Sequence, residues 1–208
     1  RSRAATPPVV RATTQLPRNV QPTNYDIEVV PNAEKMTFDG KVRINIDVLE
    51  PTDRIVLNAV DMSFANVQLG RTNGKNLKPK TGIDAAAQTA TFTFDQPLPV
   101  GSYLLSMDYS GKINTQANGL FALDYDSEAG KQRALFTQFE APDARRFVPS
   151  WDEPNYKATF NLVATVPASQ MAISNMPMAQ SNDLPGGKRL VRFQTSPKMS
   201  TYLLFFAL

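Results

Sequence analysis

The sequence contains neither cysteine nor histidine among its 208 residues. Without cysteine the chain can form no disulfide, hold no metal through a thiolate and use no cysteine nucleophile. Without histidine it lacks the usual nitrogen ligand of zinc, the base of a Ser-His pair and the ordinary general base at neutral pH. The composition therefore argues against a self-contained zinc hydrolase or serine hydrolase.

Long hydrophobic runs are also missing. No apolar stretch approaches the roughly 18 residues that a transmembrane helix requires, so we expect no membrane span. Hydrophobic residues make up 42% of the chain and aromatic residues 9%, which is typical of a soluble globular domain. A chain of this length buries about 70% of its unfolded surface on folding and needs no covalent staple.

Positive charge is concentrated at the N-terminal end. The formal net charge is +3, but residues 1–24 contain four arginines and no acidic residue, which leaves 18 basic against 19 acidic residues in the remainder. No row of Lys and Arg with interleaved aromatic residues occurs, so we expect no nucleic-acid partner. Residues 1–14, rich in Ala, Thr, Pro and Arg, are expected to form a disordered or strapping tail before one domain over 15–208.

The first residue is Arg1 rather than methionine. A short basic tail rich in Ala, Thr and Pro often follows a removed signal peptide, although a cloning boundary would look the same. An exported location, periplasmic or extracellular, is therefore favoured over a cytoplasmic one.

From Tyr25 onward apolar and polar residues alternate. The clearest case is 42–48, where four aliphatic residues are separated by polar ones, the pattern of a strand with one buried face. Further strands are predicted over 25–30, 54–58, 64–69, 89–94, 103–109, 133–139, 158–166, 189–194 and 201–207. No stretch of 12 or more residues has a convincing helical period, and the one helical candidate is short, near 142–146.

Turn signals separate many of the predicted strands. They are Asp39-Gly40, Asn73-Gly74, Val100-Gly101, Ala129-Gly130 and Gly186-Gly187. Many short strands with 16 prolines and almost no helix predict an all-β fold, an antiparallel β-sandwich or saddle-like domain.

The segment 135–160, LFTQFEAPDARRFVPSWDEPNYKATF, differs from the rest. It begins as a strand and then gathers charged residues, three prolines and the only tryptophan into a long connection. Such a loop on a β scaffold is more often functional than ornamental. The plainer interpretation is an ion pair between Arg145 or Arg146 and Asp152 or Glu153 that ties the loop down.

The stretch TQFEAPDARRFVPSWDEP is very similar to the pattern T-Q-x-E-x-x-x-A-R-x-x-F-P-x-x-D-E-P of the N-terminal β domain of aminopeptidase N-like zinc metallopeptidases. Weaker matches follow the family order along residues 15–208. They include Pro22-x-x-Tyr25-Asp26, Phe38-x-Gly40, Gly119-Leu120-Phe121, Lys157-Ala158-Thr159-Phe160 and Ser200-Thr201-Tyr202-Leu203. On these residues the chain resembles that β domain.

The resemblance implies a role in substrate binding for two residues. Glu140 would hold the protonated α-amine at the N-terminus of a peptide substrate, and Gln138 would line the first specificity pocket. The peptide bond between Glu140 and Ala141 would be cis, as is common in relatives. The zinc would belong to a catalytic domain of the same polypeptide that is missing from this chain, because neither its His-Glu-x-x-His motif nor its Gly-x-Met-Glu-Asn motif occurs here. This segment alone is therefore predicted to bind no cofactor and to be inactive.

The remaining motif residues are assigned to structural support of that site. Arg145, Arg146, Asp152 and Glu153 are expected to form one ion-pair cluster, with Trp151 as a packing anchor. Phe121 and Tyr125 are interpreted first as core residues, and the alternative is that the segment 119–125 borders the cleft. The methionines between Met171 and Met178 are interpreted as core or interface residues.

Two other functions stay open at this point. Relatives of this fold that have lost their zinc ligands serve as protein-interaction scaffolds, and the parent of this chain could be one of them. A stand-alone β-sandwich module that binds carbohydrate or protein is the weaker alternative, because the sole tryptophan lies in the family motif.

Overall fold

The computed structural model describes residues 15–140 and 142–208. The all-β fold predicted from the alternation is confirmed, and helix is limited in these residues to two single 3₁₀ turns, η1 (Ala144–Arg146) and η2 (Thr201–Leu203). The expected tail over 1–14 lies outside the described residues.

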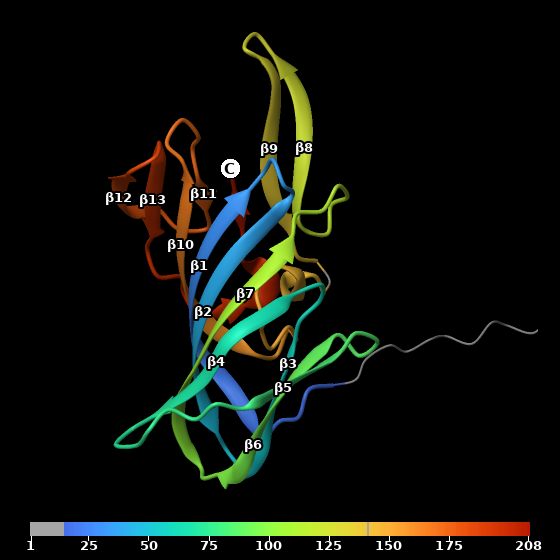
Figure 1. Ribbon diagram of the computed structural model, residues 1–208, viewed down its shortest axis with the longest axis vertical. Helices are drawn as coiled ribbons and strands as arrows, with labels where there is room; N and C mark the ends of the chain where they lie inside the picture. The colour runs from blue at the N-terminus through green and yellow to red at the C-terminus, as the bar shows by residue number, and fades with distance from the viewer. Residues whose placement is uncertain (1–14, 141) are drawn as a thin grey trace, which may run out of the picture.

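The strands form three sheets (Figure 1). The large sheet follows the order β12-β13-β10-β1-β2-β7-β4, with β14 also paired to β10; a second sheet follows β11-β15-β9-β8 and a third β3-β6-β5. The bounds of the strands are β1 Val20–Asn32, β2 Thr37–Val48, β3 Thr52–Asn58, β4 Ser63–Arg71, β5 Lys80–Asp84, β6 Thr89–Leu98, β7 Gly101–Lys112, β8 Gly119–Ser127, β9 Gly130–Gln138, β10 Lys157–Pro167, β11 Ile173–Ser174, β12 Met178–Leu184, β13 Lys188–Phe193, β14 Met199–Ser200 and β15 Phe206–Ala207.

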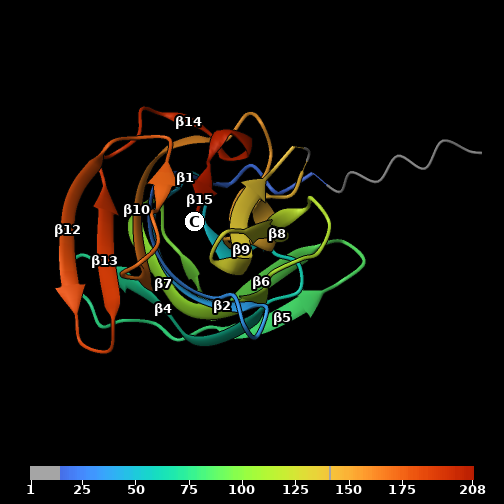
Figure 2. The ribbon, with the colours of Figure 1, turned by 90° about the horizontal axis from the view of Figure 1, so that it is seen from above.

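Seen from above, the large sheet follows an arc, with β15, β9 and β8 on its inner side (Figure 2). The sequence pattern explains this layering. Along β2 buried and exposed residues alternate almost without fault, and the buried side includes Val42, Ile44, Ile46 and Val48. These side chains enter a single core that residues from all three sheets share. One face of the large sheet is therefore buried and the other stays polar.

One strand pair departs from the antiparallel expectation. β1 and β10 run parallel, with Tyr25 opposite Phe160, and the two rings stack with centroids 4.8 Å apart. A parallel pair needs a long crossover, and here the strands β2 to β9 all lie between the two partners in the sequence. Local alternation identifies strands but not such distant partners.

Two local predictions are wrong. Asp39-Gly40 lies inside β2 rather than in a turn, because the ring of Tyr109 on β7 covers Gly40; a Cβ at this glycine would lie 2.3 Å from Cζ of that ring. Residues 201–207 form the turn η2 and the two-residue β15 instead of one strand. In addition β5 and β12 were not predicted, since their exposed residues show no apolar alternation, and β8 was not predicted although Phe121, Leu123 and Tyr125 recur at every second position.

Candidate functional site

The distinctive segment runs from the end of β9 to the start of β10 and is mostly buried. Its backbone is fixed to β3, because Asn58 and Ser150 exchange both backbone hydrogen bonds, 2.8 and 3.0 Å long. Phe147 is fully buried and contacts three aromatic rings, those of Phe38 on β2, Phe206 on β15 and Phe139. The segment thus joins the three sheets and is held as rigidly as a core element.

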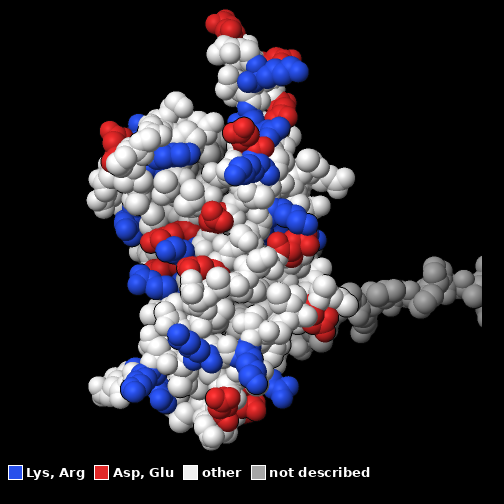
Figure 3. Space-filling model, in the orientation of Figure 1, with Lys and Arg blue, Asp and Glu red and all other residues white. Residues whose placement is uncertain are grey.

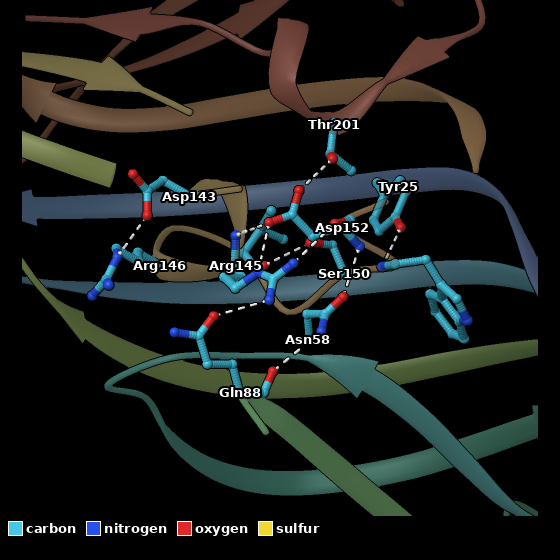
Figure 4. Close-up of polar contacts among 11 residues, drawn as sticks. Tyr25, Asn58, Gln88, Asp143, Arg145, Arg146, Ser150, Asp152 and Thr201 are labelled. Carbon is cyan, nitrogen blue, oxygen red and sulfur yellow. Dashed lines mark hydrogen bonds and ion pairs between the residues drawn. The ribbon is translucent and has the colours of Figure 1, made fainter. Parts of the chain in front are cut away.

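Arg145 and Asp152 form a buried ion pair at the centre of this segment (Figure 4). Arg145 Nε donates to Asp152 Oδ2 at 2.9 Å, and Nη2 donates to the Asp152 carbonyl at 3.0 Å. The other carboxylate oxygen accepts from the hydroxyl of Thr201 at 2.7 Å. The side chains are only 10% and 2% exposed, so this pair is screened very little by water.

Two further side chains complete the arrangement. Gln88 Oε1 accepts from Arg145 Nη1 at 3.0 Å, and Asn58 Oδ1 accepts from the Asp152 amide at 3.2 Å (Figure 4). We call the set of Asn58, Gln88, Arg145, Asp152 and Thr201 the buried latch. It ties the segment to β3, to the β5–β6 turn and to η2.

The expected single ion-pair cluster does not form. Arg146 turns the other way and pairs with Asp143 at 2.8 Å and with Asp61 at 3.6 Å. Glu153 Oε1 instead accepts from the backbone amide of Leu16 at 2.6 Å. Arg145 and Arg146 are consecutive on a 3₁₀ turn, where side chains point about 120° apart, so they cannot both reach the same acids.

Trp151 lies in the core, fully buried, which agrees with the expected packing role. Its backbone amide donates to the hydroxyl of Tyr25 at 3.1 Å. Burial raises the pKa of the Tyr25 phenol far above its ordinary value, so that this hydroxyl stays neutral. The indole Nε1 has no hydrogen-bond partner among the described residues.

Gln138 and Glu140 lie at the end of β9, where the segment begins. Both are exposed, whereas Thr137, which precedes Gln138, and Phe139, which lies between the two, are buried. Gln138 Oε1 accepts from the amide of Glu140 at 3.1 Å. The Glu140 carboxylate forms no ion pair within residues 15–140 and 142–208, in contrast to Asp143 and Asp152. Ala141, which carries the expected cis bond, lies outside the described residues.

An apolar strip lies on the same face of the β8–β9 hairpin as Gln138. The register pairs Gly119 with Gln138 and Phe121 with Phe136, and Leu123 and Tyr125 continue the strip along β8. The rings of Phe121 and Phe136 are 6.1 Å apart, whereas Leu123 and Tyr125 are about half exposed. The interpretation of Tyr125 as a core residue is therefore wrong. The spacing of Phe121, Leu123 and Tyr125 at every second position was the signal for this strip.

The middle of this hairpin is held by Arg133. Its guanidinium makes two hydrogen bonds to Asp124, 2.6 and 3.0 Å long, and donates to the carbonyl of Ala33 in the β1–β2 turn at 2.6 Å. Figure 1 shows the hairpin projecting beyond the rest of the domain. The contacts of Arg133 thus hold the hairpin that carries the apolar strip against the β1–β2 turn.

Neither a membrane-spanning helix nor a metal cluster is present in the part of the chain that the structure describes. No helix there is long and apolar enough to cross a membrane. No three Asp or Glu residues there gather as metal ligands would.

Comparison with known proteins places this arrangement in a family. The family model of the Peptidase M1 N-terminal domain matches residues 21–203, which include every strand except part of β1 and β15. The chain is 40% identical over 195 residues to aminopeptidase N of Acetobacter pasteurianus, covering 93% of this chain and 54% of that protein.

Proteins of other organisms are similar at lower identity. Aminopeptidase M1-B of Oryza sativa is 35% identical, covering 97% of this chain and 23% of that protein. Puromycin-sensitive aminopeptidase of Caenorhabditis elegans is 32% identical, covering 93% and 21%. The chain thus spans from about half to about a fifth of the length of these relatives. On the match of residues 21–203 and these identities, the chain belongs to the Peptidase M1 N-terminal domain family.

Proposed function

We propose that this chain is the substrate-anchoring and cleft-capping domain of a zinc-dependent aminopeptidase. In this proposal Glu140 binds the free N-terminus of a peptide substrate, and Gln138 shapes the adjoining pocket. The observation that carries it is the exposed carboxylate of Glu140, without an ion-pair partner among the described residues, at the end of a strand whose following segment is locked into the core.

The chemistry of the substrate explains why such a carboxylate is needed. An aminopeptidase must recognise a protonated α-amine, and a cation that leaves water for a closed cleft requires an anionic partner. A charge-assisted hydrogen bond is roughly twice as strong as a neutral one, and it also fixes the amine in space. The side-chain oxygen Oε1 of Gln138, which accepts from the backbone amide of Glu140, restrains the backbone that carries the Glu140 carboxylate.

The buried latch supports this geometry in the proposal. A substrate-binding carboxylate has to be held within about half an ångström of its productive position, and exposed loops rarely achieve this alone. Arg145 and Asp152 fix the backbone a few residues after Glu140. The buried side chain of Phe139 anchors the backbone immediately before Glu140. We therefore assign Arg145, Asp152 and Trp151 to positioning rather than to substrate contact. Arg146 supports the same turn through Asp143, and Glu153 holds the entering chain at Leu16.

The apolar strip is the surface that we assign to the catalytic domain of the same polypeptide. Leu123 and Tyr125 expose apolar area on the face that also carries Gln138. A domain packed there would close a cleft over Gln138 and Glu140 and exclude water from the amine. Such exclusion strengthens each electrostatic contact within the cleft.

Zinc enters the proposal only as a property of the rest of the polypeptide. This chain has no His or Cys, and no group of three carboxylates occurs among its described residues, so its side chains do not fit a zinc site. Recovery of one tightly held zinc per 208-residue chain after dialysis, or turnover of an aminoacyl reporter substrate by it, would contradict this division of labour.

The decisive experiment is kinetic and uses the full-length protein. Glu140→Gln removes the charge without changing the shape, and losing one partner of a desolvated ion pair costs about 2–5 kcal/mol. The specificity constant kcat/KM for peptides with a free N-terminus should therefore fall at least tenfold. Glu128, which is also exposed and lies near the tip of the β8–β9 hairpin, offers the matched control, and Glu128→Gln should leave kcat/KM unchanged.

A second variant separates recognition from folding. Glu153→Gln retains an oxygen that can accept from Leu16, and it should leave the activity of the folded enzyme near that of the natural protein. Unchanged kinetics for Glu140→Gln, together with lost activity in a well-folded Glu153→Gln variant, would reverse our assignment of recognition and support.

A further inference from the structure

A surface unrelated to the proposed substrate site lies at the other end of the large sheet. Residues 71–80, RTNGKNLKPK, contain four Lys or Arg residues and no acid, and we call them the basic loop. Its four cationic residues are Arg71, Lys75, Lys78 and Lys80. All four are exposed, and none forms an ion pair within residues 15–140 and 142–208.

The basic loop has a defined conformation. Leu69 and Leu77 exchange two backbone hydrogen bonds of 2.8 and 2.9 Å, which close its base. Arg71 folds over Gly74 and donates from Nε to the carbonyl of Lys75 at 3.3 Å, while Asn73 adopts a positive φ of 57° at the turn. The backbone that carries the cations is therefore ordered before any partner binds, which lowers the entropic cost of binding.

Exposed aliphatic side chains occupy the same end of the molecule. Arg71 on β4 lies opposite Tyr103 on β7. Two residues before Tyr103, β7 begins at Gly101, which lies opposite Val48 at the end of β2. The adjacent turn residues Val100 and Leu49 are 61% and 47% exposed. In Figure 1 the β4–β5 excursion and these turns form the lower end of the domain, away from the β8–β9 hairpin.

The charge balance of this end is positive. Arg54 is neutralised by Asp53 at 3.6 Å. Three other acids lie near this end: Glu50 in the β2–β3 turn, Asp95 within β6, and Asp47, which accepts from Ser102 at the start of β7. Figure 3 shows the resulting group of Lys and Arg side chains at the lower end, with acidic residues beside it. The excess of cations belongs to the basic loop itself.

We infer that the basic loop, together with Val100 and Leu49, docks the domain on an anionic phospholipid surface. Lysine and arginine attract such a surface, and each cation close to it increases binding about fivefold. Aliphatic residues at the tips of neighbouring turns can enter the headgroup boundary, which a soluble polyanion does not offer. A single-stranded nucleic acid would need stacking rings, and residues 71–80, 49–51 and 99–101 contain no aromatic residue.

Vesicle sedimentation with the 208-residue chain tests this inference. Vesicles of equal parts phosphatidylglycerol and phosphatidylcholine should bind the chain, and vesicles of phosphatidylcholine alone should not. The variant Lys75→Ala/Lys78→Ala should bind about 25-fold more weakly, because two cations are lost. The matched control Lys112→Ala/Lys131→Ala removes the same charge at the opposite end of β7 and on the β8–β9 hairpin, and it should bind normally.

Val100→Ser distinguishes a lipid surface from other anions, since it changes no charge. It should weaken vesicle binding by up to about tenfold, because less apolar surface enters the boundary. It should leave any binding of inorganic phosphate or of a single-stranded oligonucleotide unaltered. Equal losses for the two double-lysine variants, or equal binding to both kinds of vesicle, would each overturn the inference. Thermal unfolding of every variant shows that it is folded.

Discussion

Replacing Arg145 by methionine tests whether the buried latch holds the domain together. The substitution keeps a long side chain but removes the cation and its three guanidinium hydrogen bonds, to the carboxylate and carbonyl of Asp152 and to Gln88. The Asp152 carboxylate, 2% exposed, would then retain only the hydroxyl of Thr201 and one backbone amide as partners. Removing one partner of a buried pair costs about 3–5 kcal/mol.

This cost is large compared with the total stability of a domain, which is about 5–15 kcal/mol. For a chain of this size each kcal/mol shifts Tm by about 2–4 °C, so Arg145→Met should lower Tm by on the order of 10 °C. Urea unfolding followed by circular dichroism gives the free energy of unfolding directly. The control is Arg54→Met, the same substitution in an exposed pair, which should cost at most about 1 kcal/mol.

A double-mutant cycle shows whether the two charges act together. Asp152→Asn should also be strongly destabilising, but the double variant Arg145→Met/Asp152→Asn should lose less than the sum, since it leaves no uncompensated charge. If Arg145→Met cost no more than Arg54→Met, or if the two losses simply added, the buried latch would not be the support that we infer from its geometry.

Two further predictions concern packing and pH. Gly40→Ala should destabilise the chain by about 1–3 kcal/mol in urea unfolding, because its Cβ would meet the Tyr109 ring at 2.3 Å, whereas Gly82→Ala, with its nearest atom at 3.9 Å, should change little; equal effects would contradict this explanation of Gly40. The Arg133 hydrogen bond lowers the pKa of Asp124 below its ordinary value of 3.8. Because the folded pKa is the lower one, the carboxylate stabilises the fold fully above about pH 5, and this contribution disappears as the pH falls through the folded pKa. The difference in Tm between the natural chain and Asp124→Asn should therefore shrink on acidification, and a difference that grew would refute the assignment.

Much of the fold could be predicted because burial and alternation are local properties. The strand around Val42–Val48 follows from neighbouring residues alone, and the strand predicted over 133–139 ends within one residue of the end of β9 at Gln138. Partner choice is not local. The parallel pairing of β1 with β10, and the placement of Asp39-Gly40 inside β2 under the Tyr109 ring, depend on residues far away in the sequence.

The candidate site shows the same limit. The resemblance to a family pointed to Glu140 and Gln138, and residue types alone suggested that Arg145 could pair with Asp152. The other members of the buried latch lie 94, 57 and 49 positions from their partners in the motif. Asn58 and Gln88 carry no local signal, and the match of Ser200-Thr201 to the family did not indicate a partner for Thr201. Leu123 was overlooked because β8 is too exposed to show the pattern of a buried strand.

The parallel pair of β1 and β10 has a consequence for synthesis on the ribosome. β1 can pair with β2 as soon as both have emerged, but its other edge waits for β10, which begins 125 residues after β1 ends. At a translation rate of about 5–20 residues per second, that edge stays open for on the order of 10 s. An unpaired strand edge of 13 residues in the middle of the future sheet is a template for pairing with other nascent chains. The interval before Pro167 is made is thus the period in which this domain most needs protection by a chaperone.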